Sequence, residues 1–262
     1  MKCKRSFLLF LLVFILGIID MSGQETENRT SDFIYKLNRD KNAVIITDYI
    51  GKKTDVSVPE KIDGYPVVAF DLDFRHNFHN ITSIVFPDTI ISLGDQIFPP
   101  LSSKLKKVVL PKYITRIPDD MFQGCQNLTE IIWPENLEEI GERAFYNMRS
   151  PNMTAIVLPK TVKKIGRQAF YLCTNVKSVE LPEELEYIEN QAFYSCNQLE
   201  SVKTYQKILY IGDEAFSYCL NLKTFNTPDK KIDYGYGVFI GCAKLNSEDQ
   251  SKITNSGYNG EF

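Results

Sequence analysis

The residues best suited to chemistry in this 262-residue chain are its two histidines and six cysteines. His76 and His79 stand three apart, and two imidazoles at that spacing can share one face of a helical turn and bind a metal. Asp71 or Asp73 would supply the third ligand, but neither stands at a recognisable metal-site spacing. We therefore expect a solvated turn here, with no metal and no cofactor.

Five of the six cysteines occupy one repeated position, three residues after a phenylalanine. Leu101 and Met148 fill the same position elsewhere, and a position that accepts Cys, Leu or Met is an apolar core position. The sequence predicts a column of buried, unreactive free thiols, with one or two disulfides as the alternative in an exported chain. The five are Cys125, Cys173, Cys196, Cys219 and Cys242.

Catalytic motifs are absent from the sequence. The scarcity of histidine argues against a Ser-His or Cys-His nucleophile. There is no G-x-S-x-G, phosphate-binding loop or dinucleotide glycine pattern. Acidic residues occur singly at repeated positions, which is typical of a solvated face. The chain is therefore interpreted as a non-enzyme, although composition alone leaves open a secreted hydrolase that cleaves glycans with paired carboxylates.

The residues above belong to a repeat of about 23 residues, which is the dominant pattern of the chain. A phenylalanine recurs at intervals of 23 to 25 residues, and most copies share the phrase I-G-x-x-A-F-x-x-C with a proline before it. The phenylalanines are Phe74, Phe98, Phe122, Phe145, Phe170, Phe193, Phe216 and Phe239. Stacking such units buries a continuous core that no single unit can bury alone.

One repeat indicates which elements each unit forms. Four apolar residues, at spacings of four, five and eight, share one face of a short helix: Ile140, Ala144, Phe145 and Met148. Ile156 and Leu158 alternate as in a short strand, which Pro159 ends because proline donates no hydrogen bond. The sequence therefore predicts an α/β repeat solenoid with one short helix and one short parallel strand per repeat.

The phrases around Phe170, Phe193 and Phe216 resemble the BspA-type leucine-rich repeats of bacterial surface proteins. The opening from Asn42 to Phe70 resembles the usual entry to such arrays. Unlike the commoner leucine-rich consensus, no asparagine follows the strand, and a proline stands near there instead. The resemblance implies a right-handed array and a role in adhesion or recognition, with a host matrix or cell-surface protein as the kind of ligand.

The predicted organisation has five parts. Residues 1–23 read as a signal peptide, because a basic start precedes an apolar run too short to cross a membrane. A flexible lead (24–32), a β-rich N-terminal cap (33–70), the repeat array (71–246) and a C-terminal cap (247–262) follow. We expect the mature chain to be secreted or held at the cell surface, with no integral membrane segment.

The candidate binding face is a column of outward strand residues that is apolar in four successive repeats: Val85, Val109, Ile132 and Val157. Lys107 and Glu130, on the same predicted strands, complete it. An exposed apolar stripe often marks an interface. Strand propensity and cover by the chain's own N-terminal cap are alternatives. The next three residues of the column are polar: Glu180, Lys203 and Asn226.

Charge and the remaining columns narrow the choice of partner. A net charge of −3 gives no electrostatic footprint for nucleic acid. The family resemblance implies a protein ligand. A structural envelope protein without a specific ligand remains an alternative. Tyr146, Tyr171 and Tyr194 follow the core phenylalanines and are expected to cover an edge of the core. Alternating charges after the strand prolines predict stabilising pairs between repeats: Asp88, Lys112, Glu135, Lys160 and Glu183.

Overall fold

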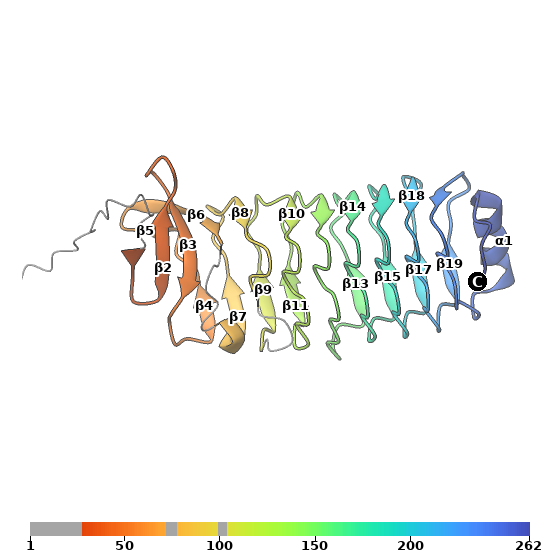
Figure 1. The fold of residues 1–262 in the computed structure, drawn as a ribbon, viewed down its shortest axis with the longest axis horizontal. Helices are drawn as coiled ribbons and strands as arrows, with labels where there is room; N and C mark the ends of the chain where they lie inside the picture. Colours follow the sequence, from red (N-terminus) through yellow and green to blue (C-terminus); the bar gives the residue numbers. More distant parts are fainter. Residues whose placement is uncertain (1–27, 72–77, 99–103) are drawn as a thin grey trace, which may run out of the picture.

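The computed structural model describes residues 28–71, 78–98 and 104–262, and it is an elongated stack of turns (Figure 1). The amino-terminal end is a six-stranded sheet in which β2 pairs antiparallel with β3, and β3 pairs parallel with β6. Its strands are β1 (Asn28–Arg29), β2 (Phe33–Leu37), β3 (Val44–Tyr49), β5 (Lys61–Ile62), β6 (Tyr65–Phe70) and β8 (Ser92–Leu93). Strand β1 falls within the predicted lead, and the predicted signal peptide lies outside the described residues.

Two faces of the stack carry parallel strands whose hydrogen bonds join successive turns. The lower edge in Figure 1 carries three-residue strands, because inward Val, Ile or Phe alternates there with outward residues. They are β4 (Asp55–Ser57), β7 (Ser83–Val85), β9 (Lys107–Val109), β11 (Glu130–Ile132), β13 (Ala155–Val157), β15 (Ser178–Glu180), β17 (Ser201–Lys203) and β19 (Thr224–Asn226). The upper edge carries β10 (Arg116–Ile117), β12 (Glu139–Ile140), β14 (Lys164–Ile165), β16 (Tyr187–Ile188), β18 (Tyr210–Ile211) and β20 (Asp233–Tyr234).

The lower strands form two separate sheets, β4-β7-β9-β11 and β13-β15-β17-β19. The interruption coincides with the one 25-residue interval, between Phe145 and Phe170, whose two extra residues lie within 149–153. On the upper edge, β12 and β14 still pair across the same two turns. The two phenylalanine rings also stay stacked, with centroids 5.1 Å apart. The array is therefore continuous on one face and open on the other.

The predicted helix in every repeat is wrong. Among the described residues, the α-helical part is α1 (Ser247–Ser256), and Phe78–Asn80 forms one 3₁₀ turn, η1. Arg143 and Asn147 have positive φ angles of 50° and 56°, which a right-handed helix does not accommodate. The Phe145 N–H donates to the Ala169 carbonyl of the next turn at 2.8 Å instead of to a carbonyl four residues back. These segments are tight turns joined by hydrogen bonds along the array.

The inward residues predicted for the helix face are nevertheless correct. Ile140, Ala144, Phe145 and Met148 are each at most 2% exposed. The I-G dipeptide explains how the turns approach so closely: a Cβ on Gly166 would stand 2.8 Å from the Ile140 carbonyl oxygen of the preceding turn. The sequence periodicity therefore predicted correctly which residues are buried, although it did not predict that the backbone forms tight turns instead of helices.

The core is a stack of phenylalanine rings along the array. Rings of adjacent turns from Phe122 to Phe216 have centroids 5.0–5.1 Å apart. Phe74, which the repeat predicts as the first member, lies outside the described residues, and the ring next to Phe98 is that of Phe78 at 5.8 Å. The stack supplies the hydrophobic burial that no single turn can achieve.

Helix α1 closes the carboxy-terminal end of the array. Asn246 caps the helix by accepting the Asp249 N–H at 2.9 Å. The Asp249 carboxylate in turn accepts the Phe225 N–H of β19 at 3.0 Å, so the helix covers the edge of the last strand. Ile253 and Tyr258 are buried against the last turn, and the Phe262 ring lies 5.9 Å from that of Phe239.

Candidate binding face

The structure places three members of the outward column side by side. In the register of the first sheet, Val85 pairs with Val109 and Val109 pairs with Ile132. Val85 and Ile132 are 39% and 46% exposed, and Val109 is half-buried. Because no described segment covers them, cover by the described part of the N-terminal cap is wrong as an explanation of their apolar character.

Val157 belongs to the second sheet, so the predicted continuous column is interrupted. It lies on edge strand β13 and is 65% exposed. Its register partner is Glu180, which begins the polar part of the column. The sequence aligned Val157 correctly within its repeat, but the insertion before β13 separates it from Ile132.

Lys107 and Glu130 meet as register partners on β9 and β11, with 2.8 Å between the ammonium and carboxylate. They form the charged margin of the apolar column. Each side chain is nearly half exposed, so the pair adds orientation more than stability.

The predicted charge ladder after the prolines is only partly present. Lys112 and Glu135 form an ion pair at 3.4 Å, and Glu135 raises the pKa of Lys112. Asp88 instead accepts the Lys112 backbone N–H at 3.1 Å. Among the described residues, Lys160 forms no ion pair, although the hydroxyl of the adjacent Thr161 donates to the Glu135 carbonyl at 3.5 Å and keeps the two turns together. Among the described residues, the ladder therefore contains one ion pair, Lys112–Glu135, and continues neither to Lys160 nor to Glu183.

A hollow of about 310 Å³ lies between β11 and β13. Trp133, the one tryptophan of the chain, stands in the inward position that Leu110 and Leu158 occupy in neighbouring turns, and it is half-buried. Its ring meets that of Phe145 at 6.0 Å. Other lining residues are mainly apolar, including Ile131, Met148, Met153, Ile156 and Phe170.

Sequence reasoning missed this opening, although two signals mark it. The first is the single 25-residue interval, and the second is a tryptophan at a position that elsewhere carries smaller residues. A bulky ring and two added residues keep the neighbouring strands from reaching pairing distance on this face. We refer below to the hollow and its two flanking strands as the β11–β13 opening.

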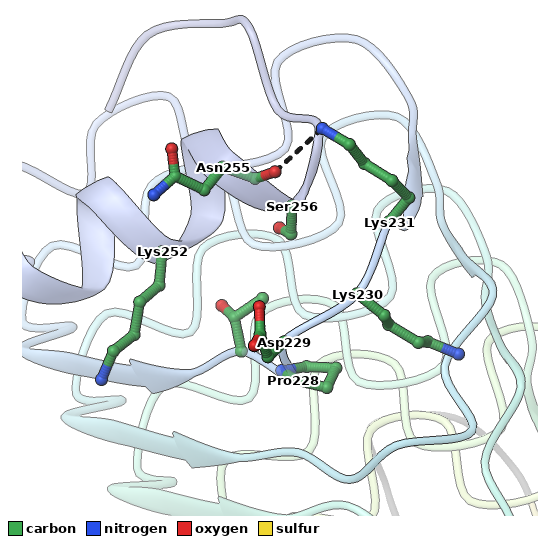
Figure 2. A pocket seen from close by; sticks show the side chains of 8 residues that line it. Pro228, Asp229, Lys230, Lys231, Lys252, Asn255 and Ser256 are labelled. Carbon is green, nitrogen blue, oxygen red and sulfur yellow. Dashed lines mark hydrogen bonds between the residues drawn. The ribbon is translucent and has the colours of Figure 1, made fainter.

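A second hollow, of about 430 Å³, lies between α1 and the loop after β19 (Figure 2). Lys230, Lys231 and Lys252 line it together with Asp229. The Lys231 ammonium donates to the Asn255 carbonyl at 2.9 Å, and the other two lysine ends point away from one another (Figure 2). The cations do not converge, so this hollow has no formed anion site.

Neither hollow has the chemistry of a glycosidase. The larger one contains a single carboxylate, Asp229, and the β11–β13 opening contains none, whereas glycoside hydrolysis uses two carboxylates. The tyrosine column also does not suit a sugar. Tyr146 and Tyr194 stack on the two faces of Tyr171 at 5.0 and 4.8 Å, so those ring faces are occupied.

The candidate metal turn falls partly outside the described residues, because His76 is in the segment 72–77. His79 is the middle residue of η1 and is exposed. Within the described ranges, no cluster of three histidine, cysteine or acidic side chains is placed to hold a metal.

The cysteine column is present as predicted, with five buried, free thiols. The Cys196 and Cys219 thiols donate to the carbonyls of Phe170 and Phe193 at 3.2 and 3.3 Å. Burial raises the pKa of Cys196 to about 12 and that of Cys219 well above its usual range. The column is therefore a packing feature whose thiols stay protonated at neutral pH.

The stacked parallel strands, the ring column and the two caps define a leucine-rich-type repeat solenoid. The chain belongs to the BspA-type leucine-rich repeat family, since six copies of that repeat region match residues 73–150 and 148–259. This family model describes a repeat region and indicates no catalytic family.

Several solved structures share the fold. A leucine-rich repeat protein of T. pallidum is 28% identical, with a TM-score of 0.62 over 90% of this chain and 99% of that one. One from Bacteroides ovatus is 21% identical, with a TM-score of 0.60 over 84% of this chain and 70% of that one. The pneumococcal vaccine antigen PcpA is 16% identical, with a TM-score of 0.50 over 85% and 80%. No curated protein matches the chain.

No helix in the described ranges has both the length and the hydropathy needed to cross a bilayer.

Proposed function

We propose that this protein is a secreted or cell-surface module that binds a protein partner through the outward face of β7, β9 and β11. The observation that carries the proposal is the exposed apolar column Val85, Val109 and Ile132 on adjacent strands. Apolar residues at the centre with a charged margin, here Lys107 and Glu130, are the usual composition of a protein interface. Val157 extends this face beyond the β11–β13 opening.

Export rests on the basic and apolar leader of residues 1–23. The family supports a binding role of this general kind. A host matrix or cell-surface protein is the class of partner that we propose, because an exported solenoid meets such proteins first. A partner-free envelope protein is the competing function, and the experiment below separates the two.

The test replaces two central residues of the column, as Val109→Asp with Ile132→Asp, in the mature chain. Both side chains point outward, so the double variant should fold with a melting temperature close to wild type. A partner captured by the wild type should be lost, because a carboxylate without a counter-charge is costly to bury in an apolar contact.

The matched control is Thr224→Asp with Asn226→Asp, at outward positions of β19 where the column is already polar. The control should keep the partner. Equal capture by the wild type and by both variants, or no specific capture by any of them, would refute this face as the binding surface.

A further inference from the structure

The two strand edges inside the array are unprotected, whereas the edge at its carboxy-terminal end is covered. At β19, helix α1 lies over the edge and Asp249 accepts the Phe225 N–H at 3.0 Å. Exposed strand edges are usually covered, because their free N–H and C=O groups pair readily with another chain. Strands β11 and β13 are edges of their sheets without such a cover in the described residues.

The hydrogen-bond pattern shows which backbone groups face the β11–β13 opening. The Ile132 carbonyl accepts the N–H of Leu110, the residue after β9, so strand alternation directs the N–H and C=O of Ile131 toward β13. The Thr154 carbonyl accepts from Lys177 of the following turn, so the same groups of Ala155 and Val157 point toward β11. Both strands thus direct backbone donors and acceptors toward the opening.

The side chains that line the opening favour particular residues in a bound peptide. The hollow between the edges takes apolar groups, because Trp133, Met153 and the rings of the core stack line it. Methionine adapts its shape to different occupants. Lys160, which is exposed three residues after the end of β13, has no ion pair among the described residues and can receive a carboxylate.

We propose that the β11–β13 opening binds an extended peptide segment of the partner as an added parallel strand. The segment has two apolar side chains, one residue apart, that enter the hollow, and an acidic residue two positions later that pairs with Lys160. This inference rests on the proposed function and names the part of the partner that is recognised. It is strand addition within an array instead of at its end.

The chain itself supplies the probe. The synthetic peptide Lys-Ser-Val-Glu-Leu-Pro-Glu copies residues 177–183, whose Val179 and Leu181 point inward and whose Glu183 aligns with Lys160. Titrated into the full mature protein, it should give a saturable shift in Trp133 emission, which reports this site alone because the chain has one tryptophan. Amides of β11 and β13 should exchange more slowly with deuterium.

The control peptide carries aspartate in place of the two apolar residues and should not bind. Lys160→Glu should weaken the binding of the original peptide about two- to fivefold, as expected for an exposed ion pair. The same protein variant should bind a peptide ending in lysine better than the wild type does. No saturable response to the original peptide, equal response to the control peptide, or no effect of the charge exchange would overturn the proposal.

A second variant removes the opening. Trp133→Leu with deletion of Pro151 and Asn152 restores the residue type and interval of the neighbouring turns, and it should join the two sheets and abolish peptide binding. Because this variant lacks the tryptophan, isothermal titration calorimetry measures its binding and that of the wild type. Undiminished binding by this variant, once it is shown to be folded, would refute the site; if it fails to fold, the charge exchange decides. Self-association that changes Trp133 emission without any peptide response would assign the opening to a second copy and overturn the peptide proposal.

The two proposals fail independently. Loss of a captured partner in the Val109→Asp, Ile132→Asp variant, together with no peptide response, would leave the outward face standing and eliminate the opening as a peptide site. Peptide binding that obeys the charge exchange, with no change in capture on altering the outward face, supports the opening and refutes that face.

Discussion

The two lower sheets have the same three-residue strands with an inward apolar residue at the centre, yet their outward faces differ. In the first sheet the outward column is Val85, Val109 and Ile132, exposed to solvent. In the second, Glu180 and Lys203 are register partners and form an ion pair at 2.8 Å. Strand propensity acts equally on both sheets, so it does not explain why the outward column becomes polar after Val157, the first member of the second sheet.

A similar difference appears on the turns that precede each core phenylalanine. In the first half of the array, Arg143 binds Asp120 of the preceding turn through two hydrogen bonds of 2.7 and 2.8 Å. In the second half, Gln168 donates to Gln191 in the corresponding position. The contacts outside the core are therefore ionic in the first half of the array at this position and between neutral side chains at Gln168 and Gln191 in the second half. The β11–β13 opening lies close to the point where this change occurs.

The largest loss of stability is expected when one phenylalanine ring is removed from the core stack, either far from the β11–β13 opening or beside it. Phe193→Ala removes a fully buried ring between partners at 5.1 and 5.0 Å, and should cost about 3–5 kcal/mol. Phe145→Ala should cost about 1 kcal/mol less, because Phe145 lines a hollow into which Trp133 can relax. Urea unfolding followed by circular dichroism measures both. Equal losses would show that the opening does not loosen the core.

The next largest loss of stability is expected from breaking the ion pair between Arg143 and Asp120. Asp120 is 4% exposed, and although burial alone would raise its pKa, hydrogen bonds from Arg143 and Gln96 lower it below the usual value. Arg143→Ala should cost about 2–3 kcal/mol, below the ~3–5 kcal/mol of a fully buried pair because the guanidinium keeps 37% exposure. The matched control, Gln168→Ala, removes one neutral hydrogen bond, to Gln191, and should cost about 1 kcal/mol.

The same pair gives a pH dependence. Because the pKa of Asp120 is lowered on folding, its contribution is complete above the unfolded value of about 3.9 and is lost as pH falls through the folded value. Wild-type stability should therefore drop more steeply in acid than that of Arg143→Ala. Parallel acid titrations of the two proteins would contradict this origin.

The smallest effect on stability at neutral pH is expected from the buried thiols. Four of the five lie in the second half of the array. Native mature protein should resist a thiol reagent, and denatured, unreduced protein should release about five thiols. Since burial raises the folded pKa of Cys196 to about 12, stability should fall as pH rises above the unfolded value of about 8.5. Cys196→Val should flatten that fall. A single thiol on denaturation would mean that disulfides exist.

The periodicity predicted the stack, the strands and the buried residues, because burial follows spacing. The helices were predicted wrongly because Ala144 and Phe145 have the same apolar spacing in a tight turn as in a helix. What separates the two is the positive φ at Arg143, which side-chain type does not reveal for a long polar residue. The interrupted column was missed because pairing depends on the path of an inserted loop, and alignment of Val157 with Ile132 does not report that path.

The one-sided interruption also has a mechanical consequence. The strands lie across the long axis of the molecule (Figure 1), so the hydrogen bonds between turns lie along it. Tension applied to the two ends would load these bonds turn by turn. Between the turns of β11 and β13, the load falls on the upper pair β12–β14, neighbouring turn contacts and the stacked rings of Phe145 with Phe170 and Tyr146 with Tyr171, without the strand pairing that the neighbouring turns have on the lower face. A stretched molecule would therefore part at this one place, leaving two shorter stacks intact on either side.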